Sequence, residues 1–210
     1  MIAIAEGEAV DNTAISASVK LYGNEGDDKI EGPHKIDSAT LNGGEGSDKL
    51  VGGNLNVTQE IFGGDNDDMI YGGDDIVTSQ ELWGDLEQDE TDTPSPVLGG
   101  NDRIYGGSVI AGTQKIYGGT YDDMIYSGDN VTGQITIFGD SATSSPNVED
   151  ATAFNLNDGD DIIDVGNNNT IVKVYGQGGN DKIIGGFGAS QVETFYGGSG
   201  DDKIWLVNPE

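Results

Sequence analysis

The sequence has no cysteine and few basic residues. Nine lysines and arginines stand against 38 aspartates and glutamates, which gives a formal net charge of −29. The lack of cysteine excludes a disulfide framework and thiolate metal sites. The shortage of basic residues excludes the basic patches with which proteins bind nucleic acid. An anionic membrane surface would also repel such a chain.

Long apolar runs are absent too. No stretch approaches the roughly 18 apolar residues of a membrane-spanning helix. Residues 1–10 carry Glu6 and Glu8 and no basic segment, so they do not form a signal peptide. Either the chain is cytosolic or its export signal lies outside this segment, and we expect the chain to be part of a longer one. His34 is the only histidine, and no nucleophile pattern accompanies it. We expect no enzyme activity.

Glycine is abundant, with 35 residues, and its spacing marks turns. A motif Asp-x-Ile or Asp-x-Leu occurs eight times, and five of the seven spacings between its aspartates are 20 or 21 residues. The other two spacings contain insertions at residues 86–98 and 141–157. The aspartates are Asp28, Asp48, Asp68, Asp102, Asp123, Asp161, Asp181 and Asp202. We expect one domain over residues 1–210, built from stacked repeats of about 20 residues.

Glycines precede most of these aspartates at fixed positions. The fullest copies, residues 43–50 and 197–204, read Gly-Gly-x-Gly-x-Asp-x-Leu and Gly-Gly-x-Gly-x-Asp-x-Ile. Two other copies replace the inner glycine with Asn66 and Tyr121. Asparagine tolerates a left-handed backbone conformation, and tyrosine does so poorly.

On these motifs, residues 21–206 resemble the RTX (repeats-in-toxin) family, whose glycine-rich nonapeptides bind calcium in a parallel β-roll. The half-turns between the motifs, such as residues 52–57, keep paired glycines but lack the aspartate. The one-sided rung is similar to the calcium-bound β-helix domains of certain bacterial ice-binding adhesins. The resemblance implies an all-β, right-handed parallel β-solenoid with calcium on one side only.

The apolar residues support this fold. Each repeat supplies two apolar positions that alternation places inside, one after the aspartate and one before the glycine turn. The first column comprises Ile30, Leu50, Ile70, Ile104, Ile125, Ile163, Ile183 and Ile204. The second comprises Leu21, Leu41, Ile61, Leu82, Ile116, Ile137, Val174 and Phe195. Sixteen such residues are a thin core for 210 positions, and the stacked aspartates would repel one another.

Calcium would stabilise the thin core and would neutralise the repulsion between the stacked aspartates, because it is a hard cation that takes 6–8 oxygen ligands. We expect roughly five to seven ions, each held by an aspartate and by turn carbonyls of neighbouring repeats. The glycines expected to shape these sites are Gly23, Gly26, Gly43, Gly46, Gly63, Gly118, Gly176, Gly179, Gly197 and Gly200. We expect the calcium-free chain to be largely unfolded.

Two outward aromatic columns are also expected. One comprises Tyr22, Phe62, Trp83, Tyr117, Phe138, Tyr175 and Tyr196, and the other comprises Tyr71, Tyr105, Tyr126 and Trp205. Stacking between repeats is the favoured interpretation, and sugar binding is the alternative. The turn residues that would face ice are charged and irregular, which argues against ice binding.

The pattern favours a calcium-binding structural module of a secreted bacterial protein, monomeric or part of a longer chain. The resemblance implies type I secretion. Two alternatives stay open. One is an extracellular module that binds polysaccharide, a cell surface or ice, and the other is the non-catalytic C-terminal arm of a secreted hydrolase or epimerase.

Overall fold

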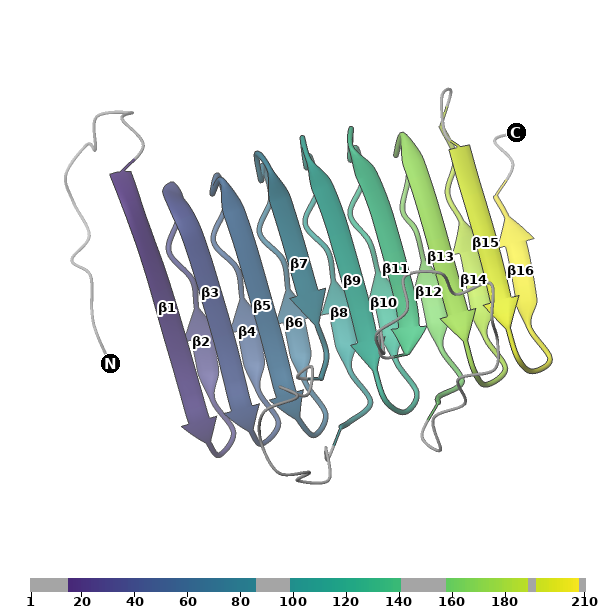
Figure 1. The fold of residues 1–210 in the computed structure, drawn as a ribbon, viewed down its shortest axis with the longest axis horizontal. Helices are drawn as coiled ribbons and strands as arrows, with labels where there is room; N and C mark the ends of the chain where they lie inside the picture. Colours follow the sequence, from purple (N-terminus) through teal and green to yellow (C-terminus); the bar gives the residue numbers. More distant parts are fainter. Residues whose placement is uncertain (1–14, 86–98, 141–157, 189–191, 208–210) are drawn as a thin grey trace, which may run out of the picture.

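A computed structural model describes residues 15–85, 99–140, 158–188 and 192–207. Within these ranges the chain forms two parallel sheets of eight strands each, which lie face to face along one body (Figure 1). The described ranges hold no helix, and so none of a length and apolarity suited to crossing a membrane. The expectation of an all-β parallel solenoid is confirmed.

Odd-numbered strands form the first sheet, here the long-strand sheet. Its strands are β1 (Ile15–Glu25), β3 (Ile36–Glu45), β5 (Thr58–Asp65), β7 (Ser79–Trp83), β9 (Thr113–Gly119), β11 (Gln134–Asp140), β13 (Ile171–Gln177) and β15 (Val192–Gly198). Even-numbered strands form the short-strand sheet. Its strands are β2 (Lys29–Glu31), β4 (Lys49–Val51), β6 (Met69–Tyr71), β8 (Arg103–Tyr105), β10 (Met124–Tyr126), β12 (Ile162–Asp164), β14 (Lys182–Gly185) and β16 (Lys203–Leu206).

Each repeat forms one rung of the solenoid. A long strand leads through an aspartate-bearing turn into a short strand, and a second turn, here called the plain turn, leads to the next long strand. Pairing follows the sequence repeat, so that Ile30 lies beside Leu50 and Leu50 beside Ile70. Every copy of the motif is therefore in register with its neighbours, including those on either side of the two insertions. The insertions themselves, residues 86–98 and 141–157, lie outside the described residues.

Two more inward columns lie beside the two expected ones, and the sequence analysis missed both. The first lies at the plain turns and comprises Ile36, Asn56, Ile76, Ile110, Val131 and Asn169. The second lies in the long strands and comprises Ala39, Gln59, Gln80, Gln114, Ile135 and Val172. All twelve side chains are buried. The expectation of a core limited to sixteen residues was wrong, because alternating positions of the long strands and turns also point inward.

Buried amides hold the plain turns together. Gln80 Nε2 donates to Gln59 Oε1 at 3.0 Å and to the Gly73 carbonyl at 2.8 Å, and Gln80 Oε1 accepts from the Gly107 amide at 3.0 Å. Gln114 Nε2 extends the ladder by donating to Gln80 Oε1 at 2.9 Å. Because amides both donate and accept, this ladder satisfies most of its polar groups without an ion. The exception is Gln114 Oε1 at its end, which is buried and has no partner among the described residues.

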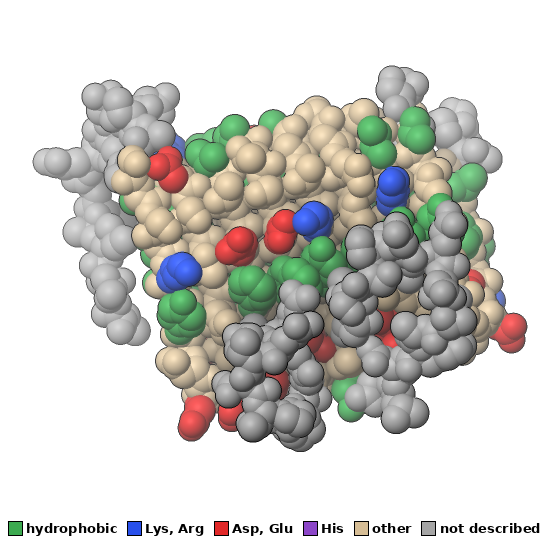
Figure 2. Space-filling view, viewed as in Figure 1, with side chains coloured by type: hydrophobic (Ala, Val, Ile, Leu, Met, Phe, Trp, Pro, Cys, Tyr) green, Lys and Arg blue, Asp and Glu red, His purple; other side chains and the backbone are tan. Residues whose placement is uncertain are grey.

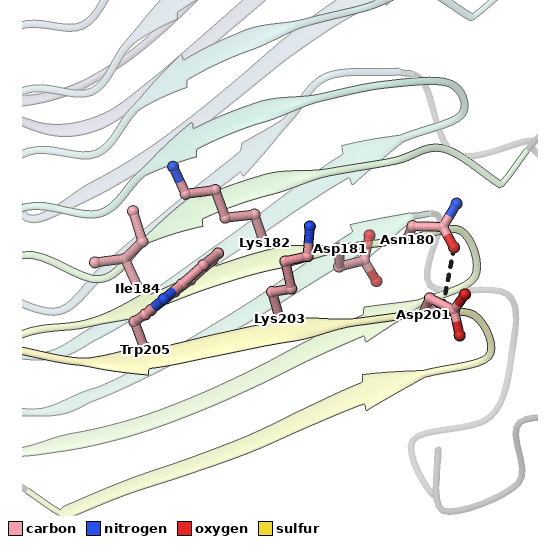
Figure 3. A pocket seen from close by; sticks show the side chains of 7 residues that line it. All are labelled: Asn180, Asp181, Lys182, Ile184, Asp201, Lys203 and Trp205. Carbon is pink, nitrogen blue, oxygen red and sulfur yellow. Dashed lines mark hydrogen bonds between the residues drawn. The ribbon is translucent and has the colours of Figure 1, made fainter.

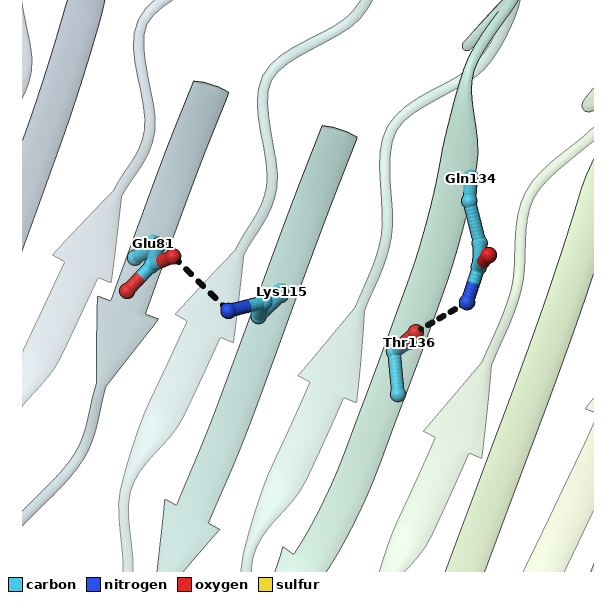
Figure 4. A network of polar contacts seen from close by, with 4 residues as sticks. All are labelled: Glu81, Lys115, Gln134 and Thr136. Carbon is cyan, nitrogen blue, oxygen red and sulfur yellow. Dashed lines mark hydrogen bonds and ion pairs between the residues drawn. The ribbon is translucent and has the colours of Figure 1, made fainter. Parts of the chain in front are cut away.

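Aromatic side chains stack along the outside of both sheets, as the sequence predicts, but Tyr22 and Trp205 do not join the stacks. Asn42 lies between Tyr22 and Phe62, and Asp164 and Ile184 lie between Tyr126 and Trp205. Phe62, Trp83, Tyr117, Phe138, Tyr175 and Tyr196 form one continuous stack, and Tyr71, Tyr105 and Tyr126 form another. Figure 2 shows a band of hydrophobic side chains across the long-strand sheet, beside a row of acidic and basic ones. On the long-strand sheet, Lys115 of β9 pairs with Glu81 of β7 at 3.0 Å, and Gln134 donates to Thr136 on β11 (Figure 4).

Candidate calcium centre

The aspartate-bearing turns have six positions, beginning with a glycine and ending with the aspartate. Uninterrupted examples are residues 43–48 and 63–68. Position 1 belongs to the long strand in every turn except that of Gly84, which directly follows β7, and the short strand begins directly after position 6. Because the strands on both sides pair in register, the eight aspartates form one column along one edge of the body.

One oxygen of each carboxylate bridges two rungs. The backbone amide of Asp28 donates to Asp48 Oδ1 at 2.6 Å, and the amide of Asp48 donates to Asp68 Oδ1 at 2.7 Å. The same bond recurs at all seven steps of the column, with the longest, 3.0 Å, between Asp181 and Asp202. The first carboxylate oxygen therefore has a fixed structural role.

The second oxygen has no such role. Within the described residues, Oδ2 is buried and has no hydrogen-bond partner in seven of the eight aspartates. They are Asp28, Asp48, Asp68, Asp102, Asp123, Asp161 and Asp181. A buried carboxylate oxygen without a partner costs free energy, about 1–3 kcal/mol or more for a charged group. Seven such oxygens in one column need a common binding partner, and the described part of the polypeptide does not supply it.

The first glycine of each turn faces this oxygen. A Cβ atom at Gly43 would collide with Asp48 Oδ2 and with the Gly63 carbonyl oxygen of the next rung. The same pair of oxygens, one carboxylate and one carbonyl, confronts the first glycine of every turn except the last. The absence of a side chain at position 1 thus brings oxygens of two rungs to one place, which is the donor set that calcium prefers.

Burial perturbs the acidity of the column. It raises the pKa of Asp68 to about 8 and that of Asp102 to about 9. Burial also raises the pKa of Asp181 to about 7, and it holds the pKa values of Asp123 and Asp161 well above the ordinary range. Neighbouring aspartates raise these pKa values further, and the amide bonds to Oδ1 oppose the change. A carboxylate kept ionised here needs a positive partner.

Basic side chains do not provide it. The two ion pairs among the described residues, Lys29–Glu31 and Lys115–Glu81, lie away from the column. In the same ranges, no three His, Cys, Asp or Glu side chains cluster closely enough to hold a metal by themselves. A site at this edge must therefore combine one carboxylate with backbone carbonyls. Such an all-oxygen set fits a hard cation and not zinc.

The two interrupted turns keep this arrangement through residues that the sequence analysis missed. Each insertion enters between positions 2 and 3, and position 2 there is an aspartate, Asp85 or Asp140, in place of glycine. Asp85 accepts from the Gly100 amide at 3.2 Å and from the Thr120 amide at 2.6 Å. These bonds tie the returning segment and the next rung to the point where the insertion leaves.

Asp140 repeats this arrangement. It accepts from the amides of Gly159 and Gly178, each at 2.9 Å, and burial raises its pKa to about 7. The first glycines of these two turns, Gly84 and Gly139, also face the column but are missing from the expected set, because the insertions separate them from their aspartates. The recurring Gly-Asp pair before each insertion was the signal that could have found them.

Substituted turn positions keep the left-handed conformation that glycine normally supplies. Asn66 and Tyr121, at position 4, have φ of 73° and 72°. Asn24 and Gln177, at position 2, have φ of 80° and 79°. Tyr121 therefore adopts the turn despite its steric cost, and the turn at residues 118–123 aligns with the others.

A comparison with protein families matches the model described as the RTX calcium-binding nonapeptide repeat at residues 19–32, 39–56, 60–77, 98–108, 111–130, 173–192 and 187–206. Together these segments cover more than half of the chain. The chain belongs to the RTX calcium-binding repeat family. No curated protein and no solved structure gives a significant match. The matched segments take in turns of both kinds, so the RTX repeat corresponds to the rung of the solenoid.

The structure brings all eight predicted RTX aspartates into one column, of which Asp28 and Asp202 occupy the ends and are only half-buried. The predicted glycines lie at positions 1 and 4 of six turns. Their role as calcium ligands stays a prediction, for which the unpartnered Oδ2 atoms are the physical basis.

Proposed function

We propose that this chain is a calcium-binding structural module of a secreted bacterial protein, whose 210 residues form one solenoid that folds when calcium binds outside the cell. The observation that carries the proposal is the column of seven buried carboxylate oxygens without a partner. Family membership supports it, because RTX repeats are calcium-binding repeats.

The residues that would hold calcium follow from the turn geometry. Between two consecutive rungs, the donors would be Oδ2 of the position-6 aspartate and the position-1 carbonyl of the next rung, for example Asp48 and Gly63. Bound calcium supplies the positive charge that offsets the buried carboxylates. Eight turns enclose seven such gaps, consistent with the expected five to seven ions.

Calcium-dependent folding would serve protein export, because it would delay folding until the chain leaves the cell. Extracellular calcium modules bind at about 10⁻⁴–10⁻³ M, well above the calcium level of the cytosol. A chain of net charge −29 would then stay unfolded before export and fold after it, as type I secretion of an RTX protein would require. We propose no catalytic role, because the recurring acidic pairs belong to the turns and occur in several rungs.

Sugar binding receives less support from the geometry. In the aromatic stacks, the centroids of neighbouring rings lie between 3.7 and 6.2 Å apart and the interplanar angles reach 19° at most, with Tyr105 and Tyr126 at 5.2 Å and 3°. Each inner ring thus has both faces covered by its neighbours, whereas a sugar ring needs an open aromatic face.

The test is far-UV circular dichroism during a calcium titration from excess chelator, with magnesium as the control ion. We expect a cooperative transition from coil to β structure with calcium only. A β spectrum that is identical in chelator and in calcium at neutral pH would refute calcium-driven folding.

A further inference from the structure

An outer column of side chains runs along the same edge as the buried aspartates. It consists of the residues at position 5 of the eight turns, all of them exposed, which are Asp27, Ser47, Asp67, Asn101, Asp122, Asp160, Asn180 and Asp201. Among the residues that the structure describes, the side-chain oxygen at position 5 accepts from the position-5 amide of the next rung at six of the seven steps. The outer column is therefore a second ladder beside that of the position-6 aspartates.

Aspartate and asparagine both make the bond of this outer ladder. Asp122 Oδ1 accepts from the Asp160 amide at 2.8 Å, and Asn101 Oδ1 accepts from the Asp122 amide at 3.0 Å. Figure 3 shows the same bond where Asn180 accepts from the Asp201 amide at 2.9 Å. The bond needs only an oxygen acceptor, so the fold does not require a charge at position 5. Five of the eight residues are nevertheless aspartate.

Each gap between two rungs supplies little negative charge for the ion proposed above. It holds one unpartnered Oδ2, and its other donor, the position-1 carbonyl, is neutral. A bound calcium ion carries two positive charges, and the amount of negative charge around it is one of the features that set the affinity of a calcium site. Asp123 and Asp161, on either side of one inner gap, are only 2% and 1% exposed, so water screens charge weakly there. Further carboxylates close to such a gap would therefore raise its affinity.

The position-5 aspartates lie where they can supply that charge. Each directly precedes a position-6 aspartate, and every gap between the described rungs has a position-5 aspartate on at least one side. The gap between Asp123 and Asp161 has one on both sides, Asp122 and Asp160. Burial is the main cause of the raised pKa of Asp161, and Asp122 on the preceding rung is among the carboxylates that raise it further. A charge in the outer ladder thus acts on the buried column.

We propose that the position-5 aspartates set the calcium affinity of the gaps beside them by attraction through space, without ligating the ion. The inference rests on the proposed function, since it concerns the same ions. One oxygen of Asp122 and one of Asp160 is held in the outer ladder, and both side chains are exposed, so their charge stays outside the shell of the ion. Each such charge should change the affinity of a neighbouring gap by about three- to tenfold.

The test removes two of these charges and keeps the ladder. In the full 210-residue chain, Asp122→Asn/Asp160→Asn places asparagine where Asn101 and Asn180 already make the same bond. A calcium titration followed by circular dichroism gives the midpoint of folding, and equilibrium dialysis at saturating calcium gives the number of bound ions. We expect the midpoint to rise about two- to fourfold, less than the change at each gap because all the ions share one cooperative transition. The number of bound ions should stay that of the parent.

A matched control makes the same charge change at the opposite edge. Asp74 and Asp129 belong to a ladder of the plain turns, in which each accepts from a backbone amide of the next rung and Asn54 makes the same kind of bond. Asp74→Asn/Asp129→Asn should therefore leave the midpoint close to that of the parent. Asn101→Asp/Asn180→Asp adds two charges to the outer ladder and should lower the midpoint by a similar two- to fourfold factor. Raising the ionic strength from about 0.1 M to about 1 M should shrink these differences, because salt screens exposed charges.

Equal midpoints for the two charge-removing variants would overturn the inference and leave the proposed function standing. Loss of a bound ion from Asp122→Asn/Asp160→Asn would also overturn it, because these residues would then be ligands. If that variant does not fold at saturating calcium, Asn101→Asp/Asn180→Asp decides alone, and an unchanged midpoint overturns the inference. Where the parent keeps its β structure in chelator yet binds calcium, half-saturation in dialysis takes the place of the midpoint. A parent chain that binds no calcium would overturn the proposed function together with this inference.

Discussion

With calcium removed by a chelator, we expect acidification from about pH 7.5 to about pH 5.5 to stabilise the fold. The groups responsible are the buried aspartates of the column. In the folded chain the pKa of Asp68 is about 8 and that of Asp102 about 9, whereas an unfolded aspartate has a pKa of about 3.9. The folded state therefore binds more protons than the unfolded state throughout this pH range.

The size of the effect follows from linkage. Each proton taken up on folding changes the free energy of unfolding by about 1.4 kcal/mol per pH unit. Over two pH units, Asp68 and Asp102 would together contribute about 5 kcal/mol, and half of that still matters for a fold of about 5–15 kcal/mol. This contribution is complete below the unfolded pKa and is lost as the pH rises through the folded pKa values.

Circular dichroism in chelator at several pH values measures the effect as the fraction of folded chain, and urea unfolding measures it wherever β structure is present. Ordinary carboxyl groups are already ionised in this range, so the buried aspartates of the column, together with Asp140, dominate the change. A His34→Gln background removes the only histidine, the other side-chain type that ordinarily titrates there. Equal or lower stability at the acidic end would refute the argument that protonation can replace a cation at the buried carboxylates. With calcium present, acidification should instead weaken binding, because protons compete for the same oxygens.

Three further variants test individual parts of the structure. Asp102→Asn should stabilise the calcium-free fold at neutral pH, by up to a few kcal/mol, and lower the number of bound calcium ions by at least about one, measured by calorimetry; unchanged calcium stoichiometry contradicts the site. Val109→Asn should raise the stability by about 0.5–1 kcal/mol in thermal unfolding, because Val109 has φ of 59° at a position where Asn130 already stands in the next rung. Gln80→Leu should cost about 2–4 kcal/mol in urea unfolding with calcium present, because it leaves buried partners unsatisfied; a neutral result would mean that the amide ladder contributes little.

The repeat made the solenoid predictable. The Asp-x-Ile spacing fixed the register of the short strands, and alternation fixed the column from Leu21 to Phe195. The inward position of Gln59 and its neighbours was not predictable, because a polar side chain on a strand ordinarily indicates the solvent face. Its burial depends on carbonyl and amide partners that only the stacked plain turns bring within reach.

The sequence predicted all eight aspartates of the candidate site, but its prediction of the glycines was incomplete. Six of the first glycines adjoin the motif in sequence, but Gly84 and Gly139 are separated from Asp102 and Asp161 by the insertions. The Gly-Asp pair before each insertion marks where the chain leaves the turn, but the sequence around Asp85 does not by itself show that the chain returns to the same turn. That closure is a tertiary feature, made by backbone amides of the following rung.

The two edges of the solenoid respond to different solution conditions, which has a mechanical consequence. The edge with the plain turns is joined by the buried amide ladder and by carboxylates that accept from backbone amides, such as Asp74 from Ser108. Among the described residues it holds no column of buried, unpartnered carboxylate oxygens. The opposite edge carries stacked carboxylates, whose repulsion grows as cations leave. Partial depletion of calcium would therefore increase the spacing of the rungs at the aspartate edge and not at the edge with the plain turns. The solenoid would then bend toward the plain turns. Its curvature would then report the calcium concentration before the fold is lost.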